Sequence, residues 1–323
     1  MGKKKIMMLV LSLFFVLGLT NVSLSKDFPE KPIRLIVCYP PGGGTDILAR
    51  GFQRALEKEL GGKVLVENIP GGNTKVGTME VMKAKPDGYT LIFASNESWI
   101  GFYYTKTYDI KVWEKLTPVG NIATDPYIII EVRAESPYKK WADLAKAAKE
   151  TPGKLTCGMI GVGGIRELAM DEMAKVVGTE WKYVPFAGAA PSSTALLGGH
   201  IDFRIVTPGE AVAMIRAGKT RGLAVSTDER MKALPDIPSF RELGIGESLM
   251  LTRAIWGPPN LPRNIVNITT KAIEKAIKDP EFVNLLENQL LCEVKYISPD
   301  RIQEGLKAWE KRYGPRLADL GNK

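Results

Sequence analysis

The feature that most constrains the fold is the alternation of strand-like and helix-like stretches that begins at residue 33. Apolar runs such as IRLIVCY (33–39) and KVLVENI (63–69) are each followed by a Gly-rich turn and then by a helix-like stretch. Strands separated by helices of about 10–15 residues are typical of parallel α/β units. A chain of 323 residues is longer than one ordinary core accommodates, so we expect two α/β lobes.

Two irregular stretches indicate where the chain crosses between these lobes: TPVGNIATDPY (117–127) and DERMKALPDIPSFRELGIGESLMLTR (228–253). We therefore expect one lobe to comprise residues 26–125 plus 229–323, and the other to comprise residues 126–228. Two lobes joined by two crossings enclose a cleft, and such clefts are where small ligands bind.

The N-terminus has the pattern of a secretory signal peptide. A basic start, MGKKK, is followed by 14 apolar residues (6–19) and then by small residues suited to cleavage. We predict that residues 1–25 are removed by cleavage near Ser25 and that the mature protein is periplasmic. An uncleaved membrane anchor is the alternative, but the apolar run is shorter than the roughly 20 residues that a spanning helix needs.

Composition argues against several other classes of protein. The net charge of +8 is modest for this length and includes the three lysines of the leader, and no basic cluster with interleaved aromatics is present, so we expect no nucleic-acid partner. Cys38, Cys157 and Cys292 lie far apart and His200 is the one histidine, which is unlike the closely spaced ligands of zinc sites. We expect no metal, no cofactor and no catalytic nucleophile–base pair.

Four small, Gly-rich turns stand between a predicted strand and a predicted helix: PPGGGTD (40–46), IPGGNTK (69–75), GMIGVGGIREL (158–168) and PFAGAAPSS (185–193). The first turn of a helix leaves backbone N–H groups unpaired and carries partial positive charge, and glycine lets a ligand approach them closely. A single such turn is often only a tight turn. Two in each predicted lobe favour a cleft that binds an anion.

Competing phosphate-binding motifs fit poorly. No G-x-x-x-x-G-K-[ST] string occurs, and GVGGIR (161–166) has Arg166 where the dinucleotide-binding fingerprint has its last glycine.

Several motifs resemble one family from about Pro32 to the C-terminus: YPPGGGTDILAR (39–50), AKPDGYTL (84–91), YVPFAGAAPSSTALLGGHID (183–202) and PDIPSFRELG (235–244). They resemble the Bug-type extracytoplasmic solute receptors of tripartite tricarboxylate transporters. The resemblance implies a type II periplasmic-binding-protein fold, in which two α/β lobes close on a ligand. It also implies a non-enzymatic, monomeric receptor that passes a di- or tricarboxylate, or a related organic acid, to a membrane permease.

The resemblance also implies a set of ligand-binding residues. In the first lobe they are Gly42, Gly43, Gly44, Thr45, Asp46, Gly72, Asn73, Ser95 and Asn96. In the second lobe they are Gly161, Val162, Gly163, Gly164, Ile165, Arg166, Ala187, Gly188 and Ala189. Asp46 would repel a carboxylate directly, so we expect it to cap the helix, or to hold a water or a ligand amine.

The chain departs from the family pattern at the second-lobe turn. Gly164 stands where serine is common and Glu167 where histidine is common, which leaves the identity of the ligand open. Arg166 has two interpretations: a surface residue paired with a nearby acid, or a cleft residue that holds a second carboxylate of the ligand. Two alternative functions also stay open, an exported enzyme on the same fold and a carboxylate sensor that feeds a membrane signalling protein.

Overall fold

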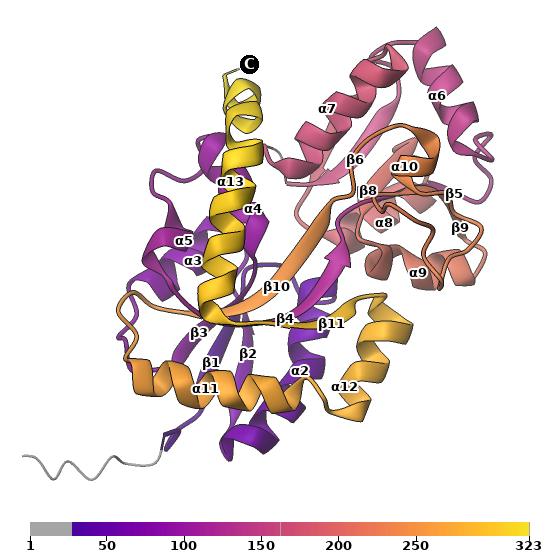
Figure 1. Cartoon of the computed structure of the whole chain (residues 1–323). Helices are drawn as coiled ribbons and strands as arrows, with labels where there is room; N and C mark the ends of the chain where they lie inside the picture. Colours follow the sequence, from indigo (N-terminus) through magenta and orange to yellow (C-terminus); the bar gives the residue numbers. More distant parts are fainter. Residues whose placement is uncertain (1–27, 162, 323) are drawn as a thin grey trace, which may run out of the picture.

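The structure, a computed structural model, describes residues 28–161 and 163–322, which form two α/β bodies joined by two long strands (Figure 1). The predicted signal peptide, residues 1–25, lies outside the described residues. Within those residues, no helix is long and apolar enough to cross a membrane.

The first lobe is built on a six-stranded sheet in the order β11-β4-β10-β3-β1-β2. Its strands are β1 (Ile33–Val37), β2 (Val64–Asn68), β3 (Thr90–Ser95), β4 (Thr117–Pro126), β10 (Met250–Gly257) and β11 (Glu293–Ile297). β1 pairs with β2 and β3 in parallel, whereas β10 is antiparallel to both β3 and β4. The predicted parallel units are therefore present, but the C-terminal strands make the sheet mixed.

Helices cover both faces of this sheet. They are α2 (Gly44–Leu60), α3 (Lys75–Met82), α4 (Asn96–Tyr104), α5 (Val112–Lys115), α11 (Arg263–Ala276), α12 (Pro280–Asn284), the π-helix η1 (Leu285–Leu290) and α13 (Pro299–Gly321). Because helices cover both faces of the sheet at β1, four of the five residues of β1 are buried. In β2, at the edge of the sheet, exposed and less exposed residues alternate. Helix α2 buries the stripe Leu48, Phe52, Ala55 and Leu56, and ends at Gly61 in the left-handed conformation.

The second lobe holds a five-stranded sheet in the order β7-β6-β8-β5-β9. Its strands are β5 (Ile129–Arg133), β6 (Thr156–Ile160), β7 (Lys182–Phe186), β8 (Phe203–Val206) and β9 (Thr220–Val225). The helices that follow them are α6 (Trp141–Glu150), α7 (Ile165–Val177), α8 (Ala189–Leu197), α9 (Pro208–Arg216) and α10 (Phe240–Leu243). Here too the β6-β7 and β6-β8 pairs are parallel, whereas β5 is antiparallel to β8 and β9.

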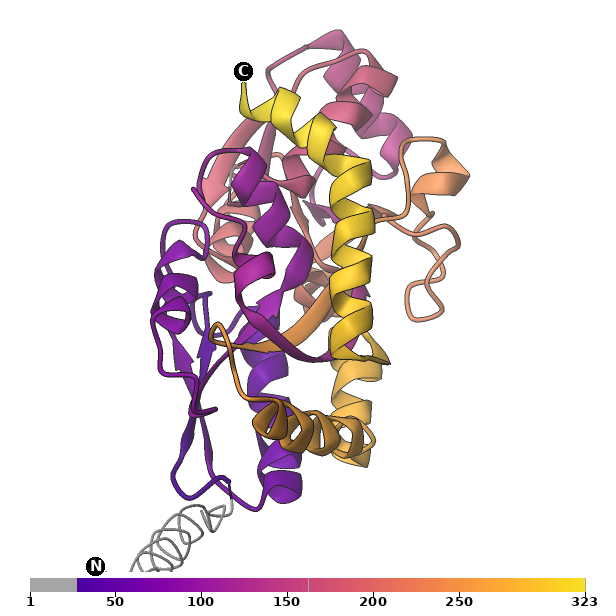
Figure 2. The same cartoon turned by 60° about the vertical axis from the view of Figure 1, so that its left-hand side comes forward.

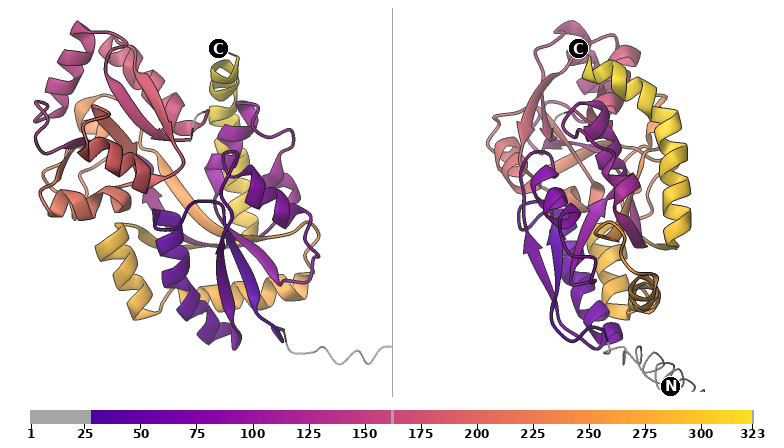
Figure 3. Two further views of the ribbon diagram at one scale, coloured as in Figure 1. Left: turned by 180° about the vertical axis from the view of Figure 1, so that it is seen from behind. Right: turned by 90° about the vertical axis from the view of Figure 1, so that its left-hand side faces the viewer.

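Strands β4 and β10 run side by side between the bodies, paired from Thr117↔Gly257 to Pro126↔Met250. Seen from behind, they link the two bodies (Figure 3). The chain enters the second sheet between Pro126 and Ile129 and has left it after Val225. The predicted lobe limits at 125/126 and 228/229 stay a prediction, although the sheet changes near both.

Helix α13 runs along the first lobe and reaches α7 of the second (Figure 2). Arg316 on α13 forms an ion pair with Glu172 on α7. The hydroxyl of Thr105 also donates to the carbonyl oxygen of Gly163 at 2.6 Å. The lobes are therefore in contact in this conformation.

Candidate functional site

A cleft between the lobes brings together three of the four Gly-rich turns and part of the fourth. Its inner part, about 30 Å³, and its outer part, about 210 Å³, share Tyr39, Ser98, Tyr127, Ile160 and Arg166. The inner part is also lined by Pro40, Pro41, Gly43, Gly44, Thr45, Ser95, Gly188, Ala189, Ala190, Pro191, Glu210, Leu251 and Arg253. The outer part is also lined by Cys38, Pro70, Gly71, Gly72, Asn73, Thr74, Phe102, Gly161, Phe186 and Ala187.

The turn between β1 and α2 presents backbone donors to the inner cleft. Gly42 is in the left-handed region, with φ 80°, and Gly43 is extended, so that α2 begins at Gly44 with its N-terminus toward the second lobe. The N–H of Gly44 donates to Glu210 at a long 3.4 Å. The N–H groups of Thr45 and Asp46 have no partner among the described residues. These groups are the donors that an anion needs.

Asp46 supports this turn from behind and does not line the cleft. Its carboxylate accepts hydrogen bonds from the N–H of Gly42, from Arg50 and from Asn68, each at 2.9 Å. Burial alone would raise its pKa, but these hydrogen bonds outweigh burial and hold the pKa below its ordinary value. Of the residues expected here, Gly43, Gly44 and Thr45 therefore line the cleft, and Gly42 and Asp46 shape the turn.

Arg253 on β10 is a cleft residue that the sequence-based predictions missed. Its guanidinium binds both carboxylate oxygens of Asp125, each at 3.0 Å. It also donates to the hydroxyls of Thr45, at 2.6 Å, and Ser95, at 3.0 Å. Burial opposes its charge, but Asp125 outweighs burial and raises the pKa of Arg253. A charged residue within the apolar stretch TRAIWGP (252–258) was the available signal, because buried charges need dedicated partners.

Of the two ligand-binding residues expected after β3, Ser95 and Asn96, only Ser95 lines the cleft. Ser95 lines the inner cleft, as does Ser98, whose hydroxyl lies 3.5 Å from that of Tyr127. Asn96 does not line the cleft: its amide donates to Thr252 and accepts from the indole of Trp256, each at 2.8 Å. Asn96 thus ties α4 to β10 behind the site.

The turn before α7 packs against α4 of the first lobe, and of the residues from Gly163 to Arg166 only Arg166 reaches the cleft. The N–H of Gly163 is taken by the carboxylate of Glu167 at 2.7 Å, and a Cβ on Gly101 would lie only 3.0 Å from the Cα of Gly164. Gly163, Gly164 and Ile165 consequently line neither part of the cleft. Gly161, with φ 73°, does line the outer part. Val162 lies outside the described residues.

The turn before α8 provides the second lobe's open backbone donors. Ala187 lines the outer part, Gly188 and Ala189 line the inner part, and the N–H groups of Ala189 and Ala190 have no partner among the described residues. A Cβ on Gly188 would lie 3.5 Å from Pro40 of the first lobe. The starts of α2 and α8 therefore face each other across the inner part of the cleft.

A buried arginine holds this second turn in place. Arg204 on β8 pairs with Glu131 on β5 at 2.6 Å, and both side chains are fully buried. The same guanidinium donates to the carbonyl of Ala189 and to the hydroxyl of Ser192, at 3.0 and 3.1 Å. The turn is thus positioned by a group that does not itself line the cleft.

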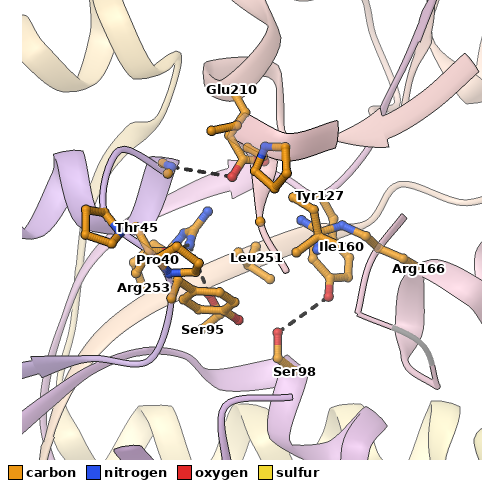
Figure 4. Close-up of a pocket in the computed structure, with 18 residues that line it drawn as sticks. Pro40, Thr45, Ser95, Ser98, Tyr127, Ile160, Arg166, Glu210, Leu251 and Arg253 are labelled. Carbon is orange, nitrogen blue, oxygen red and sulfur yellow. Dashed lines mark hydrogen bonds between the residues drawn. The ribbon is translucent and has the colours of Figure 1, made fainter. Parts of the chain in front are cut away.

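Arg166 lies in the cleft and not on an outer surface. Its guanidinium stacks on the ring of Tyr127 at 4.4 Å (Figure 4). Arg166 lines both the inner and the outer part of the cleft. Its Nε is buried without a hydrogen-bond partner, and no acid among the described residues forms an ion pair with it. An unpaired cation held over an aromatic ring is well suited to bind an anionic group.

The outer part of the cleft is closed by the turn that contains Gly72 and Asn73. Asn73 and Thr74 both have positive φ, 49° and 72°, which is uncommon for residues other than glycine. Gly72 and Asn73 both line this wall, as expected. The site therefore combines backbone donors, two arginines, hydroxyls and aromatic rings, whereas His200 is exposed and lines neither part.

Comparison with known proteins yields consistent similarities. The sequence profile described as "Tripartite tricarboxylate transporter family receptor" matches residues 48–311. A UPF0065 protein of Bordetella pertussis is 33% identical over 266 residues, which covers 82% of each chain. The structure of the periplasmic binding protein BugD is similar with a TM-score of 0.79 and 28% identity, covering 91% of this chain and 97% of that one. An R. palustris protein with adipate is similar with a TM-score of 0.82 and 26% identity, covering 92% and 99%.

Proposed function

Because this chain belongs to the tripartite tricarboxylate transporter receptor family, we propose that it captures a small carboxylate in the interlobe cleft and delivers it to the membrane permease of such a transporter. The chain has the two-lobed periplasmic-binding-protein fold, and its family is one of solute receptors, not enzymes. We further propose that residues 1–25 direct export and that the receptor acts as a monomer in the periplasm.

The observation that carries this proposal is the unpaired guanidinium of Arg166. A cation that faces a cleft without an acidic partner costs free energy unless a ligand compensates it. Its planar donors match the two oxygens of a carboxylate, and a carboxylate would also satisfy the orphan Nε.

The helix starts provide a second anchoring point. In this proposal, one carboxylate accepts from the N–H groups of Thr45, Ala189 and Ala190 between α2 and α8, next to the charge of Arg253. A second carboxylate reaches Arg166, which makes the ligand a diacid or larger. The adipate bound to the R. palustris protein, a related receptor, is a diacid of this type.

A carboxylate panel tests this proposal. Mono-, di- and tricarboxylates of two to eight carbons are screened by thermal shift, and binders are titrated by calorimetry. A ligand at 100 times its Kd is expected to raise the free energy of unfolding by about 2.7 kcal/mol. Arg166→Lys keeps the charge but loses the planar fork, so it should weaken binding of the best diacid roughly tenfold or more.

Arg241→Lys is the matched control, because Arg241 is an exposed residue of the same lobe outside the cleft. It should leave affinity unchanged. The proposed function is wrong if no carboxylate binds, and the role of Arg166 is wrong if the two lysine variants behave alike.

A further inference from the structure

Glu210 places a carboxylate in a cleft that otherwise presents donors and cations. It belongs to α9 of the second lobe and lines the inner part of the cleft. Figure 4 shows its side chain reaching toward the start of α2, where Oε1 accepts from the N–H of Gly44 at 3.4 Å. The first-lobe anion site therefore has an acid of the second lobe at its edge.

This carboxylate cannot easily leave the cleft, because it caps its own helix. Oε2 accepts from the N–H of Thr207 at 3.0 Å, and Thr207 and Glu210 together form a capping box at the start of α9. The contact with Gly44 is long, and each carboxylate oxygen has two lone pairs, so Oε1 can accept further hydrogen bonds. Glu210 is thus a fixed acceptor with spare capacity, directed at the ligand space.

Three charged side chains line the inner cleft: Arg253, Arg166 and Glu210. Arg253 is compensated by Asp125, through two hydrogen bonds. Neither Arg166 nor Glu210 forms an ion pair among the described residues, although Glu210 lies close enough to Arg253 to contribute to its raised pKa. The cleft therefore offers one cation and one anion that have no ion-pair partner. A ligand that carries only carboxylates would place like charges beside Glu210, which disfavours binding.

We propose that the ligand carries a protonated amine next to the carboxylate that binds at the start of α2, and that Glu210 accepts hydrogen bonds from this amine. The inference rests on the proposed function, because it assumes a carboxylate in the cleft. An amino group on the carbon beside a carboxylate lies close enough to put the carboxylate on the N–H of Thr45 and the ammonium on Oε1. With a second carboxylate at Arg166, the ligand is an amino dicarboxylate.

Matched acids that differ in one substituent test this inference. The probes are succinate, malate and aspartate, with the corresponding five- and six-carbon sets, each titrated by calorimetry against the mature protein. We expect the amino acid of at least one set to bind about tenfold or more tighter than the unsubstituted acid of equal length, since a hydrogen bond between charged groups has this effect.

Glu210→Gln separates recognition from capping, because glutamine also serves in a capping box. It should weaken the amino acid about tenfold and leave the unsubstituted acid unchanged or tighter. Asp143→Asn is the matched control: Asp143 accepts from the N-cap N–H of Lys140 at the start of α6, as Glu210 does from Thr207 at α9, but lies outside the cleft. This variant should not change the preference.

Three outcomes overturn the inference. One is equal or tighter binding of the unsubstituted acids, and another is a preference for the hydroxy acids. The third is an equal change for all acids in the Glu210→Gln protein, and an equal gain would identify Glu210 as a competitor of any carboxylate. Binding of no acid at all would instead remove the proposed function, and this inference with it.

Discussion

Both lobes place a buried arginine beneath their side of the cleft, but the two arginines are satisfied differently. In the first lobe, Arg253 meets both oxygens of Asp125 at 3.0 Å. In the second lobe, Arg204 meets one oxygen of Glu131, whose other oxygen, Oε1, is buried without a hydrogen-bond partner by distance and angle. The first pair is thus fully matched, whereas the second leaves an acceptor unused.

The difference indicates how each lobe contributes to recognition. Arg253 reaches the cleft itself and donates to the hydroxyls of Thr45 and Ser95, so the first lobe presents side chains that are held in place by hydrogen bonds. Arg204 stays behind the cleft and holds the carbonyl of Ala189. The second lobe instead presents Arg166 and Glu210, the residues we propose to select the ligand.

Removing one acid from each pair should give the largest difference between the lobes. Asp125→Asn leaves the buried charge of Arg253 without its ionic partner, and should lower the free energy of unfolding by about 3–5 kcal/mol. Glu131→Gln should cost less, about 1–3 kcal/mol, because it also removes the negative charge from a buried oxygen that has no hydrogen-bond partner. Urea unfolding measures both. Equal losses, or a larger loss for Glu131→Gln, would contradict the comparison.

The pH dependence of stability should report on another buried acid of the first lobe, Glu97. Glu97 is buried at the start of α4 and accepts from the N–H and hydroxyl of Thr252 on β10, at 2.9 and 2.7 Å. Burial raises its pKa from 4.5 to about 7 in spite of these bonds. A raised pKa means that its stabilising contribution is complete below about pH 4.5 and is lost as the pH rises through 7.

The loss amounts to about 3 kcal/mol across this window, since one pKa unit corresponds to 1.36 kcal/mol. Glu97→Gln cannot ionise, so the stability of the wild type relative to this variant should fall between pH 4.5 and pH 8. Urea unfolding at several pH values provides the measurement. A constant difference between the two proteins would show that Glu97 does not titrate in this range.

The most local effects we predict concern one glycine on each side of the cleft. Gly43 and Gly188 both have extended backbones that accept a side chain, and their added Cβ atoms would meet nothing closer than 3.5 Å. Gly43→Val should cover the donors of α2 and lower the binding free energy by roughly 1.5–3 kcal/mol. Gly188→Val should instead press on Pro40 and hinder closure of the lobes.

Calorimetry and small-angle scattering distinguish these two effects. Gly43→Val should weaken binding while a saturated sample still closes, whereas Gly188→Val should leave the saturated protein more open than the wild type. Gly305→Val, at an open position on α13, serves as the control. Identical scattering of both cleft variants at saturation would mean that the two glycines do not have separate roles.

The sequence predicted those turns and helices that are determined by residues close together along the chain. The turns before α2 and α8 were recognisable because a strand, small residues and an amphipathic or capped helix follow one another along the chain. Helix α4 was missed for the opposite reason: seven of its nine residues are buried, so it has no amphipathic stripe. Arg166, one of the predicted candidates, lines the cleft, whereas its neighbours Gly163 and Gly164 line neither part of it.

The remaining site residues depend on contacts across the chain. Arg253 meets Asp125, which lies 128 residues earlier, and Glu210 meets Gly44, 166 residues earlier. The sequence around Glu210 predicts only a helix cap, and its second partner appears when the lobes approach. No local pattern encodes such pairings.

The path of the chain also determines the order in which the molecule can be assembled. All strands of the second lobe lie within one continuous stretch, 129–225. In the first lobe, β3 pairs with β10, which comes much later in the chain and places Arg253 opposite Ser95. Because the polypeptide is synthesised from its N-terminus, the second lobe can complete its sheet while the first lobe still lacks β10. Domains generally fold as units in this direction, and distant strand pairings form slowly. Arg253 on β10 is therefore the last of the cleft residues to be placed, so the protein can bind its ligand only after the first lobe has folded completely.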